Sequence, residues 1–109
     1  LLLARADSWP EAIIITLAPV IVAPIFEELL FRGFFYRMLR DRMGVYGAVL
    51  FTSFLFAAVH PSVLTVLPLF ALGAVFALLY EATGSILPSI VAHAMHNLAS
   101  VGMLYVMLQ

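Results

Sequence analysis

Three charged residues lie inside one of the most apolar stretches of this chain: Glu27, Glu28 and Arg32. Residues 12–26 are apolar except for one threonine and two prolines, and the apolar character continues around Arg32 as far as Tyr36. On insertion scales a charge near the middle of a bilayer costs about 2.5–3.5 kcal/mol, so three unpaired charges would cost about 8–10 kcal/mol. The fold must therefore give these charges partners, and charges retained in such segments usually serve a function.

The composition indicates that lipid is the solvent of this chain. Its 109 residues are 65% hydrophobic and only 10% charged, whereas a soluble domain is about one quarter charged. The net charge of −1 argues against a nucleic-acid partner, and the lack of Cys excludes disulfides, thiolate catalysis and zinc–thiolate sites. Because the chain begins without Met, we expect it to be a piece of a longer protein.

The apolar segments predict an all-α fold, a multi-pass transmembrane bundle of about four helices. The expected helices cover 12–36, 46–60, 63–80 and 86–108, and residues 1–109 form a single membrane-embedded domain. Prolines inside the first and third segments are tolerated in membranes, where neighbouring groups satisfy the freed backbone atoms. Small residues in the third segment permit close helix packing: Ala71, Gly73, Ala74 and Ala77.

Two glycine-containing turns are expected at the same side of the membrane, at Gly44 and at Gly84. Arg37, Arg40 and Arg42 precede the first turn and form the densest cluster of cations in the chain. Under the positive-inside rule this cluster marks the cytoplasmic side.

Helix geometry places several polar residues at a common depth. Glu28 and His60 are equally far along the chain from Gly44, so a hairpin at this glycine brings them to one level. His93 and Asn97 rise about 13 and 20 Å from the second turn, toward the same depth. The spacing of Glu28 and Arg32, four residues with the acid first, favours an ion pair, while Glu27 points about 100° away.

Each of these polar residues also has a structural explanation. The Glu28–Arg32 pair could act only as a clamp, and Glu27 could extend to the membrane interface. His60 could cap a helix end, His93 could be a packed, hydrogen-bonded histidine, and an asparagine such as the one at 97 often joins transmembrane helices. Their joint occurrence at one depth nevertheless favours a functional site. Phe56 is expected to pack, and His96 to lie beside the site rather than in it.

Three motifs occur in order along the chain: Glu27-Glu28-x-x-x-Arg32, Phe56-x-x-x-His60 and His93-x-x-x-Asn97. Together they resemble the motifs of the CAAX protease and bacteriocin-processing family of intramembrane glutamate-type endopeptidases. The flanking residues also resemble that family, with Ala23-Pro24 before the first motif and residues 83–88 before the last.

The resemblance implies a membrane-embedded protease core and assigns roles to single residues. Glu27, with His60, would activate a water molecule that attacks the scissile carbonyl. His93 and Asn97 would hold the developing oxyanion, while the glutamate–arginine pair would organise the first helix. No cofactor is expected. The implied substrates are prenylated CAAX-type C-termini or bacterial peptides, acted on in the plasma membrane of a prokaryote.

Other functions remain open at this point. The histidines and glutamates could hold zinc in a metalloprotease, although no His-Glu-x-x-His helix is present and Asn is an unusual zinc ligand. A non-enzymatic protein of bacteriocin immunity, or a membrane scaffold, would keep the motifs and act by binding. A proton-coupled transporter would also carry intramembrane Glu and His, but no inverted repeat is evident. The expected partners are a peptide or membrane-protein substrate and the lipid bilayer.

Overall fold

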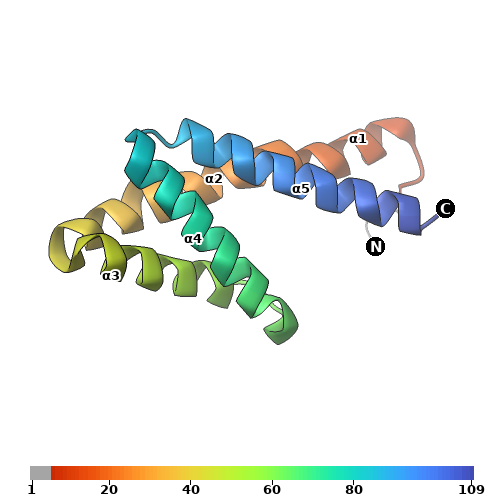
Figure 1. The fold of residues 1–109 in the computed structure, drawn as a ribbon. Helices are drawn as coiled ribbons and strands as arrows, with labels where there is room; N and C mark the ends of the chain where they lie inside the picture. The colour runs from red at the N-terminus through yellow and green to blue at the C-terminus, as the bar shows by residue number, and fades with distance from the viewer. Residues whose placement is uncertain (1–5) are drawn as a thin grey trace.

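The computed structural model describes residues 6–109, which consist of helices joined by short turns and contain no strand (Figure 1). This confirms the all-α prediction. The elements, in chain order, are α1 Trp9–Leu17, the π-helix η2 Ala18–Val22, α2 Ala23–Glu28, the π-helix η3 Leu29–Tyr36, α3 Arg37–Ala58, the 3₁₀-helix η4 Val63–Thr65, α4 Val66–Thr83 and α5 Leu87–Met107.

The chain reverses direction inside α3, at Gly44. This residue has φ 75° and ψ −177°, a conformation that is essentially restricted to glycine. Figure 1 shows the helix from α1 to residue 43 running to one end of the molecule, and the rest of α3 returning alongside it. Gly84, with φ 67°, ends α4 in the left-handed conformation at the same end of the molecule. Both expected turns, and their common side, are therefore confirmed.

Three helical stretches of the described residues are long and apolar enough to cross a membrane: Trp9–Ala58, Val63–Thr83 and Leu87–Met107. The first contains the reversal at Gly44, so it holds two of the four predicted segments. Large apolar side chains cover the outside, including Tyr46 and Leu64. In water such a surface would be unfavourable, so it matches a lipid environment.

Several helix boundaries differ from the prediction by a few residues, among them the two on either side of Pro61. The second segment ends at Ala58 rather than at His60, because the His60 N–H donates to the carbonyl of Ala57 and tightens the last turn. Pro61 follows and stops the helix. The next α-helix, α4, then begins three residues later than expected, at Val66.

The α4 helix packs closely against α3 at Gly73. A Cβ atom at this position would lie 3.1 Å from both Phe56 Cδ1 and the Cα atom of Ser53. Close to this contact, the aromatic rings of Phe31, Phe56 and Phe76 form one buried cluster. Gly73, a small residue that the sequence predicted for helix packing, therefore allows α4 to approach α3 closely.

Candidate active site

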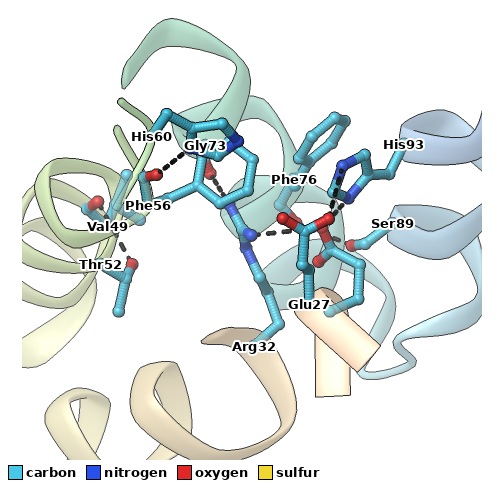
Figure 2. A network of polar contacts seen from close by, with 11 residues as sticks. Glu27, Arg32, Val49, Thr52, Phe56, His60, Gly73, Phe76, Ser89 and His93 are labelled. Carbon is cyan, nitrogen blue, oxygen red and sulfur yellow. Dashed lines mark hydrogen bonds and ion pairs between the residues drawn. The ribbon is translucent and has the colours of Figure 1, made fainter. Parts of the chain in front are cut away.

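The elements from α1 to residue 43 follow one another without a break and are called the first helix below. A cluster of buried polar side chains lies where this first helix meets α4 and α5 (Figure 2). Glu28 and Arg32 are completely buried, and His93 is 3% exposed. Glu28 ends α2, Arg32 lies in η3 and His93 lies in α5, so packing of separate segments assembles the cluster.

The predicted ion pair within the first helix is present. Arg32 Nη1 donates to Glu28 Oε1 over 3.2 Å, and Arg32 Nη2 donates to the carbonyl oxygen of Gly73 over 2.5 Å. The guanidinium carbon lies 4.9 Å from the ring centroid of Phe56 and 5.4 Å from that of Phe76. The arginine is therefore held by a carboxylate, a backbone carbonyl and two aromatic rings, which offset the cost of burying its charge.

His93 joins the Glu28–Arg32 pair to Glu27. Its Nδ1 lies 2.8 Å from Glu28 Oε1, and its Nε2 lies 3.5 Å from Glu27 Oε2. The ring stacks on Phe76 with a centroid distance of 4.8 Å and an interplanar angle of 17°. Because a carboxylate accepts hydrogen bonds, Glu28 holds the proton on Nδ1 and turns Nε2 toward Glu27.

Glu27 differs from its neighbour in exposure. Its side chain is 29% exposed, whereas that of Glu28 is completely buried. Adjacent positions on a helix point about 100° apart, so one carboxylate faces inward and the other reaches the edge of the cluster. Of these two carboxylates, only that of Glu27 is open to an incoming molecule.

His60 packs against the ring of Phe56, which also lies near the ring of His93 (Figure 2). The Phe56 ring centroid is 5.1 Å from that of His60 and 5.7 Å from that of His93. His60 Nδ1–H donates to the carbonyl of Phe56 over 2.7 Å, which leaves Nε2 as an acceptor. Among the described residues, no hydrogen bond or ion pair joins His60 to Glu27.

Asn97 and His96 occupy different surroundings on α5. Asn97 is half-buried, and its Nδ2 donates to the carbonyl of Pro19 over 2.8 Å. His96 is exposed, and its side chain makes no hydrogen bond within residues 6–109. The structure therefore brings Asn97 to the interface with the first helix, one turn from His93, and leaves His96 outside the cluster.

A second polar cluster, which the sequence did not suggest, lies near the two turns. Tyr36 Oη donates to Glu81 Oε2 over 2.6 Å, and Arg40 Nη2 lies 3.1 Å from Glu81 Oε1. These contacts join the first helical segment to the end of α4. They combine residues more than 40 positions apart, so no local spacing could have indicated them.

The donor set gives little support for a metal. Within the described part of the chain, no three His, Cys, Asp or Glu side chains are placed so that they could hold a metal ion. His93 already faces a carboxylate with each ring nitrogen. The expectation that the reaction needs no metal stays a prediction.

The apolar helices and the enclosed acid–histidine cluster define an integral membrane protein with a buried polar site. The family described as "Type II CAAX prenyl endopeptidase Rce1-like" matches residues 9–99. The chain belongs to this family, as its three motifs had suggested.

A curated relative points to the same kind of protein. The chain is 38% identical over 77 residues to a protein of Bacillus subtilis (strain 168) named "Putative membrane peptidase YdiL". The matched part is 71% of this chain and 32% of the relative, so the chain spans about a third of the relative's length. No solved structure matches the chain.

Proposed function

We propose that this protein is a membrane-embedded endopeptidase in which Glu27 is the general base. The observation that carries the proposal is the chain of contacts from Arg32 through Glu28 and His93 to Glu27. Three buried groups fix one another and end at a carboxylate that is partly exposed. Such an arrangement resembles the logic of catalytic triads, in which a buried acid orients a histidine toward the reacting group.

In the proposed reaction, Glu27 accepts a proton from a water molecule, and the water oxygen forms a bond to the scissile carbonyl carbon. The electron pair of the carbonyl bond moves onto its oxygen. That electron pair then re-forms the carbonyl bond, the carbon–nitrogen bond breaks with its electrons moving to nitrogen, and Glu27 returns the proton to the leaving amine. His60 Nε2, which is free to accept a hydrogen bond, is suited to hold the same water.

Two groups on α5 are suited to stabilise the oxyanion. His93 Nε2, when protonated, can donate to it, because the other ring nitrogen is held by Glu28. The Asn97 amide has two N–H bonds, and the hydrogen bond to Pro19 uses only one of them. The other remains for the substrate. Prearranged donors of this kind contribute strongly in a site of low dielectric constant.

The description of the matching family suggests the substrate class. We propose that the substrate is a peptide with a prenylated CAAX-type C-terminus, or a bacterial membrane-associated peptide that presents a similar lipid-linked end. The exposed apolar surface of the helices would let such a substrate reach the site from the bilayer.

A cleavage assay of the full-length protein in detergent tests the proposal, with prenylated and unprenylated peptides compared side by side. Glu27→Gln keeps the size and hydrogen bonding of the side chain but removes the base, so we expect activity to fall at least about 10²-fold. His96→Gln is the matched control, since His96 is exposed, and it should retain wild-type activity.

Two results would contradict the proposal. Activity near wild type in the Glu27→Gln protein would remove this carboxylate from the reaction. If a strong chelator abolished the activity of the wild-type protein and zinc restored it, a metal rather than Glu27 would activate the water.

A further inference from the structure

The first helix contains a backbone carbonyl whose usual partners are missing. In an α-helix the carbonyl of Pro19 would accept from the N–H of residue 23, and in a π-helix from that of residue 24. The N–H of Ala23 donates instead to the carbonyl of Ala18, and Pro24 has no N–H. Pro19 lies in η2 and Pro24 lies five residues later, in the first turn of α2, and this spacing therefore frees the oxygen of Pro19.

Asn97 supplies the partner for this freed oxygen. Its Nδ2 lies 2.8 Å from the carbonyl of Pro19, across the interface between α5 and η2. Because a carbonyl can only accept, the contact fixes which end of the amide points to Pro19. The remaining N–H and the amide oxygen are then fixed as well.

This contact lies next to the polar cluster rather than apart from it. His93 precedes Asn97 by one helical turn and faces Glu27 and Glu28 of the same first helix. The α5 helix is thus attached to the first helix by polar contacts at two successive turns. A shift of the contact at Asn97 would also change the position of His93.

We infer that Pro24 is a positioning residue for the active site, and this inference rests on the proposed function. By withholding an N–H, Pro24 keeps the oxygen of Pro19 available, and that oxygen orients the Asn97 amide and the register of α5. Pro24 is itself completely buried among the helices, and its side chain has no group that could accept or donate a proton in the proposed reaction.

The test replaces Pro24 by Ala, which provides an N–H that competes with Asn97 for the oxygen of Pro19. A misplacement of about 1 Å in a catalytic group can lower turnover by up to about 10²-fold. We therefore expect kcat of the full-length Pro24→Ala protein to fall by about 10- to 10²-fold with KM little changed. Pro68→Ala is the control, because Pro68 is exposed in the first turn of α4 and should leave both constants unchanged.

A second comparison separates positioning from general damage. In an Asn97→Ala protein, Pro24→Ala should have no further effect on kcat, because the amide that it displaces is already gone. Replacing Pro24 by lactate, the α-hydroxy acid that has the methyl group of Ala but no N–H, should restore kcat to near the wild-type value.

The inference is overturned if Pro24→Ala stays within twofold of wild type, or if it lowers kcat equally with and without Asn97. It is also overturned if the lactate protein is folded but as slow as the Ala protein, or if neither folds, because Pro24 would then be needed only for folding. These results leave the proposed function standing as long as cleavage still depends on Glu27. If Glu27→Gln is fully active, both proposals fall.

Discussion

At the scale of single residues, one oxygen atom connects folding to the proposed chemistry. Glu28 Oε1 contacts both Arg32 Nη1 and His93 Nδ1, while Glu28 Oε2 has no hydrogen-bond partner among the described residues. The same carboxylate oxygen therefore neutralises the buried arginine and orients the histidine. We therefore expect loss of the contact to Arg32 to lower stability and loss of the contact to His93 to lower activity. Stability and activity can be measured separately.

Replacing Arg32 by Leu should damage folding more than it damages chemistry directly. It leaves the Glu28 carboxylate buried without its cation, and removing one partner of a buried ion pair costs about 3–5 kcal/mol. We expect a clear drop in thermal stability in detergent. The double replacement Glu28→Leu with Arg32→Leu should regain part of that stability but no activity, because His93 Nδ1 then has no acceptor.

Equal melting temperatures for wild type and Arg32→Leu would show that the ion pair does not contribute to stability. Recovery of peptidase activity in the double variant would show that Glu28 does not orient His93.

The sequence predicts only some of the contacts within this cluster, for physical reasons. Glu28 and Arg32 are one helical turn apart, so their pairing follows from helix geometry. The contact between Glu28 and His93 spans 65 positions and depends on packing; the sequence indicated only a similar depth. The carbonyl of Gly73 could not be predicted as the acceptor for Arg32, because every residue has such a carbonyl.

At the scale of elements, the glycine turns and the four apolar segments were predictable, but the π-helical turns were not. Apolar periodicity cannot tell an α-helix from a π-helix over a few residues. The local signal is the pair Pro19 and Pro24, and from the sequence these prolines indicate only that backbone atoms are freed for neighbouring groups. The π-helices η2 and η3 flank the two glutamates on both sides. Such turns often occur at functional sites.

Close packing of α4 on α3 gives a prediction for Gly73. An Ala side chain there would lie 3.1 Å from the backbone of Ser53, which cannot rotate away, so the two helices must separate. Overpacking of this kind typically costs about 1–3 kcal/mol. We expect Gly73→Ala to lower the melting temperature and to weaken the contact between Arg32 and the carbonyl of residue 73.

Gly102 of α5 is the matched control. A Cβ atom at this position meets nothing within 4 Å, and Ala favours a helix over Gly by about 1 kcal/mol. The Gly102→Ala protein should therefore be as stable as wild type or more stable. Equal destabilisation by both changes would contradict the packing argument.

At the scale of the whole molecule, the described helices form a thin body of 49 × 27 × 17 Å. A helix with its side chains is about 10 Å wide, so the body is less than two helices thick in its smallest dimension. Most large apolar side chains therefore face outward. Glu27, whose side chain is 29% exposed, lies near the surface of this body, which agrees with the proposed approach of a peptide from the bilayer.

The charges predict how this body is oriented in the membrane. Arg37, Arg40 and Arg42 lie at the end that carries the two turns, whereas the beginning of α1 lies at the other end (Figure 1). Under the positive-inside rule we expect the turn end to face the cytoplasm. Since the chain has no Cys, a single introduced thiol reports its own side of the membrane without interference.

Two exposed positions at opposite ends make this a paired test, Asp41→Cys beside the first turn and Ser8→Cys before α1. Gly44 itself is unsuitable, because its backbone conformation requires glycine. In intact cells, a membrane-impermeant thiol reagent should label the Ser8→Cys protein and leave the Asp41→Cys protein unlabelled until the membrane is opened. The reverse pattern would place the arginine cluster outside and would contradict the predicted orientation.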